Sequence, residues 1–254
     1  MSLFIETTGR GPDLVMLHGW GLHGGLFRPL IDSLSKTLRL HLVELPGHGR
    51  SPMIDGDYTL SAIAKTIAKQ VPKNANWLGW SLGGRVAIQA AADGVGIDKL
   101  ILVGNNPCFV QQQGWPHAMP ESELVQFADS LKNDYKQTLL RFIALQSRGS
   151  ERGREELREL RSELFAHGDP DLKALAGGLE ILRGADLRSL LPAVEQQTLV
   201  LHGNRDTLAP LAAAEFTATQ LPHGELKVIE GAGHAPFISH PEPCIVAIEE
   251  FING

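Results

Sequence analysis

The chain contains only two cysteines and lacks any apolar run approaching the roughly 20 residues that a membrane-spanning helix requires. Cys108 and Cys244 lie far apart and outside the spacings of metal-binding motifs, so we expect free thiols in a reducing compartment. Residues 1–13 have no basic segment followed by an apolar stretch, and we therefore expect no secretory signal. These absences predict a cytoplasmic protein that makes no contact with a membrane.

Basic residues are scarce relative to acidic ones. The 254 residues include 23 Lys and Arg against 29 Asp and Glu, a net charge of −6 that disfavours binding to nucleic acid. The ten histidines form no H-E-x-x-H motif and no Cys/His cluster, so the sequence predicts neither a metal nor any other cofactor. Hydrophobic residues make up 43% of the chain, which is enough for the core of one α/β domain with an insertion. We expect the protein to be a monomer.

Short apolar runs alternate with helical patterns in the first 107 residues. The runs are typical of buried parallel strands and cover residues 14–17, 38–43, 77–80 and 100–103. Apolar residues recur at helical spacing between them, around 27–34 and 60–71. The alternation resumes with strands expected at 198–202 and 226–229 and helices at 211–221 and 243–252. This order predicts an α/β fold, with a mostly parallel central sheet and helices on both faces.

Residues 110–190 interrupt the alternation. The segment is rich in charge and in helix formers, lacks a convincing strand run, and shows apolar stripes near 124–131, 139–146 and 151–165. We expect it to form a helical cap over the functional site. The predicted organisation is a first core part at 1–109, the cap at 110–190, and a second core part at 191–254.

Residues 79–83, Gly-Trp-Ser-Leu-Gly, match the G-x-S-x-G pattern of a nucleophilic serine. A short apolar strand precedes the pattern and a helical run follows it, which is the context that the motif requires. Side chains two positions before or after the serine would collide in the strained turn, which explains why both positions are glycine. Ser81 is therefore the predicted nucleophile.

A serine hydroxyl needs a base in order to attack at neutral pH. His234 lies in a glycine-containing loop directly after the strand expected at 226–229, and we favour it over His240, which stands at the start of the last helix. Asp206 follows the strand expected at 198–202 and is the predicted acidic partner of the histidine. Serine, acid and histidine then occur in the chain order of the α/β-hydrolase fold.

The loop after the strand at 14–17 reads His-Gly-Trp-Gly. In this fold a backbone N–H of that loop and the N–H of the residue after the nucleophile form the oxyanion hole, which assigns the roles to Trp20 and Leu82. We interpret His18 as a structural brace of the loop rather than a catalytic group. The side chains of Trp20 and Trp80 fit a wall of the site and a place in the core equally well.

Longer motifs carry a resemblance that extends along the whole chain. They lie at 17–22 (LHGWGL), 44–51 (ELPGHGRS), 77–84 (WLGWSLGG) and 232–241 (AGHAPFISHP), with cap segments at 141–146 (RFIALQ) and 177–188 (GGLEILRGADLR). On these motifs the chain resembles the pimeloyl-acyl-carrier-protein methyl ester carboxylesterases. The G-x-S-x-G and His-Gly motifs are shared across α/β hydrolases, whereas the Gly-Trp-Ser elbow, the cap segments and the last motif are more diagnostic.

The resemblance implies hydrolysis of the methyl ester of a pimeloyl chain carried by acyl carrier protein, in biotin synthesis. It implies a triad of Ser81, Asp206 and His234. It also implies substrate contacts at Trp20, Ser81, Leu82, Phe142, Ile143, Ala144, Leu145, Gln146 and His234. The acidic carrier protein would meet basic cap residues, for which the candidates are Arg141, Arg154, Arg158 and Arg161. Surface ion pairs are the alternative for these arginines, because Glu151, Glu155 and Glu159 interleave with them at salt-bridge spacing.

Other functions remain compatible with the same residues. A short-chain or aryl carboxylesterase of broad specificity, or a carbon–carbon bond hydrolase, would keep the same triad. Dehalogenases and epoxide hydrolases are disfavoured because they need an aspartate in place of Ser81. A non-catalytic binding protein on a hydrolase scaffold is disfavoured by the intact triad. The residues leave open the preferred acyl chain length and the need for the carrier.

Overall fold

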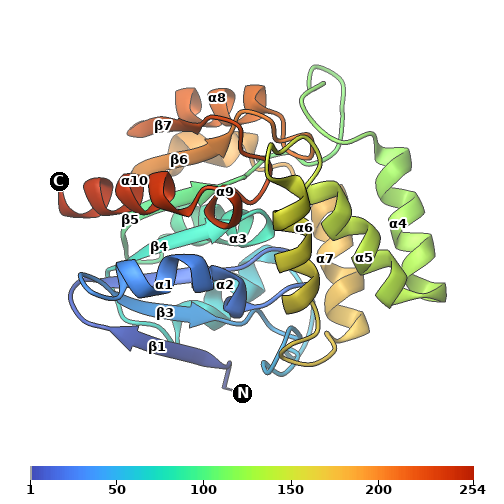
Figure 1. The fold of residues 1–254 in the computed structure, drawn as a ribbon, viewed down its shortest axis with the longest axis horizontal. Coiled ribbons are helices and arrows are strands. Elements are labelled where there is room, and N and C mark those ends of the chain that lie inside the picture. The colour runs from blue at the N-terminus through green and yellow to red at the C-terminus, as the bar shows by residue number, and fades with distance from the viewer. Residues whose placement is uncertain (1) are drawn as a thin grey trace.

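A single sheet lies at the centre of the computed structural model, which describes residues 2–254. Its spatial order is β1-β3-β2-β4-β5-β6-β7, in which β1 pairs antiparallel with β3 and every other pair is parallel (Figure 1). The strands are β1 (Ile5–Gly9), β2 (Asp13–Leu17), β3 (Arg39–Val43), β4 (Ala75–Trp80), β5 (Ile97–Val103), β6 (Gln197–Gly203) and β7 (Gly224–Ile229). The mostly parallel sheet expected from the sequence is confirmed.

The strands β2 to β7 coincide with the predicted apolar runs, with ends shifted by a few residues. Strand β4 is buried along its whole length, as expected for a central strand covered on both faces. Strand β1 was not predicted, because its sequence Ile-Glu-Thr-Thr-Gly contains one apolar side chain and forms no run. It lies at the edge of the sheet, where partly exposed polar residues keep further chains from pairing.

Helices cover both faces of the sheet (Figure 1). Helices α1 (Arg28–Leu34), α9 (Pro236–Ser239) and α10 (Pro241–Asn253) pack together on one face. Helices α2 (Leu60–Ala68), α3 (Leu82–Ala92) and α8 (Leu211–Gln220) cover the other, with α3 and α8 joined through the short helix η2 (Arg188–Ala193). A second short helix, η1 (Gly24–Phe27), leads into α1.

The chain between β5 and β6 forms the four helices of the cap, which stand together at one end of the sheet (Figure 1). They are α4 (Glu121–Asn133), α5 (Tyr135–Gln146), α6 (Gly153–Glu163) and α7 (Leu172–Gly184). Within this part of the described chain, β-type pairing is limited to isolated bridges, such as that between Val110 and Met119. The cap covers the carboxyl ends of the parallel strands, which is where open α/β sheets bind their ligands.

The described residues include no helix with both the length and the apolar character needed to cross a membrane.

Candidate active site

Ser81 occupies the sharp turn between β4 and α3. Its backbone has φ 53°, a left-handed value that strains a residue with a side chain. The turn brings backbone segments so close that a Cβ on Gly79 would lie 2.5 Å from the carbonyl oxygen of Gly83. A Cβ on Gly83 would lie 2.3 Å from the carbonyl oxygen of Leu17. The two glycines are therefore a steric requirement of the turn that projects the serine above the sheet.

Ser81, His234 and Asp206 form a continuous chain of hydrogen bonds. The Ser81 hydroxyl lies 3.0 Å from Nε2 of His234, and Nδ1 of His234 lies 2.7 Å from Oδ2 of Asp206. The other carboxylate oxygen of Asp206 accepts hydrogen bonds from the backbone N–H groups of Leu208 and Ala209, each at 2.8 Å. Ser81 is 7% exposed and His234 only 1%. The structure thus brings together three residues that are distant in sequence, in a site that is largely shielded from solvent.

The electrostatics of Asp206 suit the orientation of a histidine. Burial alone would raise the pKa of this carboxyl group. The charge and hydrogen bond of His234, with a smaller contribution from His202 at 3.5 Å, outweigh burial and hold the pKa of Asp206 below its usual value. The ionised carboxylate keeps the proton of the imidazole on Nδ1, which leaves Nε2 free to accept the proton of Ser81.

The loop that carries His234 is held from both the core and the cap. The indole N–H of Trp80 donates to the backbone carbonyl of His234 at 2.9 Å, so this side chain supports the loop in addition to filling the core. The backbone N–H of His234 donates to the carbonyl of Gln146 at 3.3 Å. His240, the alternative base, contacts Ser239 and stands at the start of α10.

The backbone N–H groups of Trp20 and Leu82 are free to serve as oxyanion donors. The loop at 18–21 lies against the nucleophile, because a Cβ on Gly19 would be 3.3 Å from Cβ of Ser81. Leu82 is the first residue of α3, where a backbone N–H has no acceptor inside the helix. No backbone acceptor within residues 2–254 pairs with the N–H of Trp20. Their role in the oxyanion hole stays a prediction.

The interpretation of His18 as a brace is confirmed by its contacts. Its Nδ1 donates to the carbonyl of Gly19 at 2.8 Å, and its Nε2 accepts from the N–H of Leu45 at 2.9 Å. Both ring nitrogens are therefore engaged in joining the loop after β2 to the loop after β3.

The side chains of the cap segment 142–146 lie on two sides of α5. Phe142 is buried with its ring 4.8 Å from that of Trp20, which places it beside the predicted oxyanion loop. Ile143 and Gln146 are also buried. Ala144 and Leu145 instead line a groove of about 660 Å³ between α4 and α5, together with Arg141. Phe142 and Gln146 thus contact Trp20 and the His234 loop, and the predicted substrate contacts of Phe142, Ile143, Ala144, Leu145 and Gln146 stay a prediction.

The four candidate docking arginines, Arg141, Arg154, Arg158 and Arg161, are all exposed. Within residues 2–254, no ion pair involves any of them. Glu151, one of the interleaved acids, pairs with Arg205 of the core at 2.8 Å. The alternative of surface ion pairs along α6 is therefore not supported.

Two buried polar residues at the site were not predicted from the sequence. The side-chain amide of Asn105 donates to the carbonyl of Ser81 at 3.1 Å and so supports the strained turn. Glu156 of α6 is fully buried beside the His234 loop. A short polar residue after a strand and a glutamate in a charged helix are each too common for either position to stand out before the fold is known.

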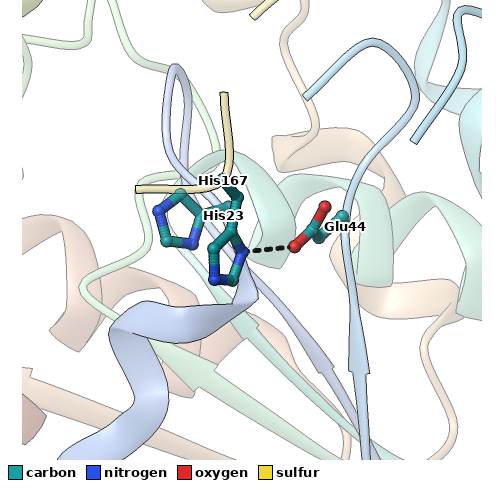
Figure 2. Close-up of side chains that lie close together, drawn as sticks. All are labelled: His23, Glu44 and His167. Carbon is teal, nitrogen blue, oxygen red and sulfur yellow. Dashed lines mark hydrogen bonds and ion pairs between the residues drawn. The ribbon is translucent and has the colours of Figure 1, made fainter. Parts of the chain in front are cut away.

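A second polar cluster lies outside the triad, and its three members are drawn in Figure 2. His23, Glu44 and His167 offer ligand-type atoms within 4.8 Å of one another. The two rings stack with centroids 3.8 Å apart, and because nitrogen lone pairs lie in the ring planes, stacked rings do not converge on one ion. The guanidinium of Arg50, 2.6 Å from Glu44, already neutralises the carboxylate. This geometry favours a hydrogen-bonded ion pair over a metal centre.

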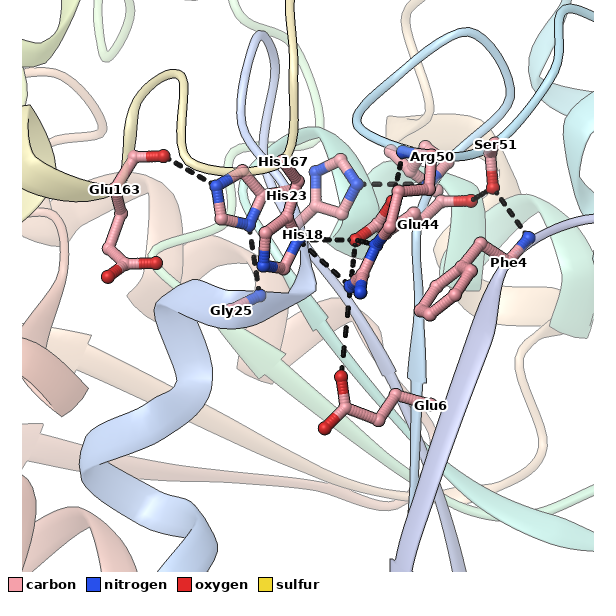
Figure 3. Close-up of polar contacts among 11 residues, drawn as sticks. Phe4, Glu6, His18, His23, Gly25, Glu44, Arg50, Ser51, Glu163 and His167 are labelled. Atoms are coloured by element: carbon pink, nitrogen blue, oxygen red, sulfur yellow. Dashed lines mark hydrogen bonds and ion pairs between the residues drawn. The ribbon is translucent and has the colours of Figure 1, made fainter.

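The same cluster ties the cap to the core (Figure 3). His167 lies between α6 and α7, and its Nδ1 is 2.6 Å from the carboxylate of Glu44, which follows β3. His23 of the core reaches the backbone carbonyl of Glu163 at the end of α6, at 2.5 Å. The end of α6 that is distant from the triad is thus held to the core by two hydrogen bonds between cap and core.

Buried neutral histidines predict a loss of stability in acid. Burial is the main cause that lowers the pKa of His48 to about 4, from 6.5 in the unfolded chain. The unfolded state then binds more protons below pH 6.5, so the free energy of unfolding falls as the pH falls. For His48 alone we expect a loss of about 2 kcal/mol between pH 7 and pH 5. Its Nε2 has no hydrogen-bond partner among the described residues. The carbonyl of Pro46, which accepts from Nδ1 at 3.1 Å, also accepts from the hydroxyl of Tyr58 at 2.9 Å, so phenylalanine is a suitable replacement.

The measurement is urea unfolding of the wild type and of His48→Phe at both pH values. The variant should lose less stability on acidification, by about 2 kcal/mol. Equal losses in the two proteins would show that His48 does not titrate in this way.

Comparisons with known proteins agree with this geometry. A model described as "Alpha/beta hydrolase family" matches residues 14–247. The chain is 42% identical over 250 residues to the pimeloyl-[acyl-carrier protein] methyl ester esterase of Xanthomonas oryzae pv. oryzae, covering 98% of each protein. It is 43% identical over 245 residues to the protein of the same name from Nitrosomonas europaea, covering 96% of this chain and 97% of that one.

Solved structures extend the comparison. An esterase from Exiguobacterium antarcticum superposes with a TM-score of 0.86 at 25% identity, covering 99% of this chain and 96% of that one. A bromoperoxidase from Bacillus anthracis superposes with a TM-score of 0.87 at 20% identity, covering 99% and 95%, a likeness of fold alone.

Proposed function

The chain belongs to the alpha/beta hydrolase family and, within it, to the pimeloyl-[acyl-carrier protein] methyl ester esterases, and from this premise we propose that it hydrolyses the methyl ester of pimeloyl-acyl carrier protein in biotin synthesis. The observation that carries the proposal is the chain of hydrogen bonds from Asp206 through His234 to Ser81. An alcohol activated in this manner attacks carbonyl carbon, which is the chemistry of a carboxylic ester hydrolase.

The proposed reaction has two steps. His234 accepts the proton of Ser81 as the serine oxygen attacks the ester carbonyl, and the ionised Asp206 stabilises the imidazolium that forms. The N–H groups of Trp20 and Leu82 stabilise the oxyanion, each contributing about 3 kcal/mol to the lowering of the barrier. Methanol leaves with the proton from His234. Water, activated by the same imidazole, then hydrolyses the acyl-enzyme and releases the free acid.

Two assays test the substrate. The first compares the methyl esters of free and carrier-bound dicarboxylates with aryl esters and with substrates of carbon–carbon bond hydrolases. The second is complementation of a biotin auxotroph lacking this esterase, by wild type and by Ser81→Ala. We expect the highest kcat/KM for the carrier-bound methyl ester and growth with the wild type only. A preference for aryl esters without complementation would favour a carboxylesterase of broad specificity.

We extend the proposal to the domain organisation, the cellular compartment and the partner of the protein. The division into core parts at 1–109 and 191–254 and a cap at 110–190 follows the position of helices α4 to α7 in the chain. A net charge of −6 disfavours nucleic acid as a partner. We propose that the enzyme is a cytoplasmic monomer whose partner is the acyl carrier protein.

The cap arginines are the proposed docking surface for the acidic carrier protein. All four are exposed and free of ion pairs within residues 2–254, so their charges are available to a partner. We expect Arg141→Glu combined with Arg158→Glu to raise KM for the carrier-bound ester by about 10-fold or more, because like charges then face each other. The kcat for a small free methyl ester should not change.

The matched control for docking is Arg10→Glu. Arg10 is exposed and lies in the turn between β1 and β2, at the end of the sheet opposite the cap. Steady-state kinetics at two salt concentrations separate charge from shape, since screening weakens the arginine effect. A rise of KM in the Arg10 variant that is as large, for each charge reversed, as in the double variant would show that net charge, rather than a docking surface, is responsible.

A further inference from the structure

Glu156 is a charged residue type in a position suited to leucine. Helix α6 buries one stripe, and Glu156 lies on that stripe with Leu160 one turn later. Its exposed fraction is 0%. Both carboxyl oxygens lack a hydrogen-bond partner of regular geometry within the described chain. Because a buried polar group without partners is destabilising, its presence on an apolar stripe indicates a purpose other than packing.

The surroundings of Glu156 point to the catalytic histidine. Apart from burial, the groups that influence the pKa of its carboxyl group are the hydroxyl of Ser150, the backbone N–H of Ala235, and the ionisable side chains of His234 and Asp206. Ser150 itself packs on the loop, because a Cβ on Gly233 would lie 3.1 Å from its Cβ. The hydroxyl of Ser150 also lacks a partner of regular geometry among residues 2–254. Two buried polar groups of the cap without hydrogen-bond partners, the carboxyl of Glu156 and the hydroxyl of Ser150, therefore lie near the loop that carries His234.

Further contacts fasten the same cap segment to this loop. The N–H of Glu151 donates to the carbonyl of Gly231 at 2.9 Å, and the N–H of His234 donates to the carbonyl of Gln146 at 3.3 Å. Arg152 donates to the carbonyl of Ser239 at 3.0 Å. The segment from Gln146 to Arg152 is thus attached to residues 231–239 at three points, and Glu156 follows one turn later on the same helix.

We propose that Glu156 is a positioning residue, whose carboxyl group holds loop 231–235 from the cap so that His234 faces Ser81. The donors available to the carboxyl group in this role are the N–H of Ala235 and the hydroxyl of Ser150, and neither pairs with it at regular hydrogen-bond geometry in this structure. When ionised, its charge also favours the protonated imidazole formed during catalysis. The inference rests on the proposed hydrolase chemistry of Ser81 and His234.

The titration of Glu156 gives this role a signature. Burial, the largest influence, raises the pKa of Glu156 to about 7, although Ser150, His234 and Ala235 act in the opposite direction. The carboxyl group therefore changes charge in the pH range in which a histidine base operates. A residue that only filled space would leave the pH profile of the enzyme unchanged.

The test compares Glu156→Gln and Glu156→Leu on a small methyl ester that needs no carrier. Glutamine keeps the shape and a hydrogen-bonding oxygen but removes the charge. We expect the acid limb of its kcat/KM profile to move to lower pH by about half a unit or more, with kcat at pH 8 within about 3-fold of wild type. Leucine removes both features, and we expect kcat to fall about 10-fold or more while KM changes little.

The matched control is Glu163→Gln. Glu163 is also buried on the stripe of α6, but it lies at the far end beside His23. Thermal unfolding shows that each variant is folded. An acid limb that superposes on that of wild type, or a folded Glu156→Leu with full kcat, would overturn the role of Glu156. An inactive wild type would instead count against the proposed function, so the two failures are distinguishable.

Discussion

Ser81→Ala should lower kcat for ester hydrolysis by about 10⁵- to 10⁶-fold, the loss expected when a triad nucleophile is removed. The variant keeps the cap, the oxyanion donors and the His234–Asp206 pair, but no oxygen remains at the turn to attack the ester. Because Ser81 is 7% exposed and its backbone strain arises from φ 53°, alanine fits the same space with little change in stability. Single-turnover and steady-state kinetics with a methyl ester provide the measurement.

Ser81→Cys is the informative companion of the alanine variant. A thiol of similar size keeps a nucleophile at the same place, so this variant should form an acyl-enzyme that mass spectrometry detects, whereas the alanine variant should form none. Turnover by Ser81→Ala at more than about a thousandth of the wild-type rate would refute the assignment of the nucleophile.

Asp206→Asn should lower kcat by about 10⁴-fold with little effect on KM. In the wild type, Oδ1 of Asp206 accepts from the N–H groups of Leu208 and Ala209, and Oδ2 accepts from Nδ1–H of His234. An asparagine that keeps its oxygen toward the two backbone donors must direct its NH₂ group at Nδ1. The imidazole then carries its proton on Nε2, which faces the hydroxyl of Ser81 and can no longer accept the proton.

The control for this change is Asp93→Asn. Asp93 is an exposed aspartate at the opposite end of α3, where it is hydrogen-bonded to Ser61 and Gln89. The same carboxyl-to-amide replacement there should leave kcat unchanged. If Asp206→Asn retained more than about a tenth of wild-type kcat, Asp206 would not be the group that orients His234.

Much of the site could be predicted because its signals are local. Short apolar runs located β2 to β7, and the strand–turn–helix context distinguished Ser81 from a chance match. The order of serine, acid and histidine then selected Asp206 and His234, because each follows a strand at the same edge of the sheet. These features depend on backbone sterics and on strand order, both of which leave a pattern in the sequence.

The features that escaped prediction depend on tertiary packing. Strand β1 pairs at the edge with polar residues, so it has no apolar run to detect. Glu155 and Glu156 are adjacent and chemically identical, yet only Glu156 is buried, and the rotation of α6 against the core decides which. The alternative of ion pairs along α6 could not be decided from the spacing either, because Glu151 pairs with Arg205 of the core instead.

The fastening of α6 at both ends has a kinetic consequence. One end is held to the core through His23 and His167, and the other follows the loop of the base, while the serine beneath is almost sealed. A serine this enclosed is reached by substrate after part of the cap moves, so admission becomes a separate step ahead of bond breaking. Esters with good and poor leaving groups would then share the same maximal kcat, because the rate of cap opening, and not the reactivity of the carbonyl, would limit turnover.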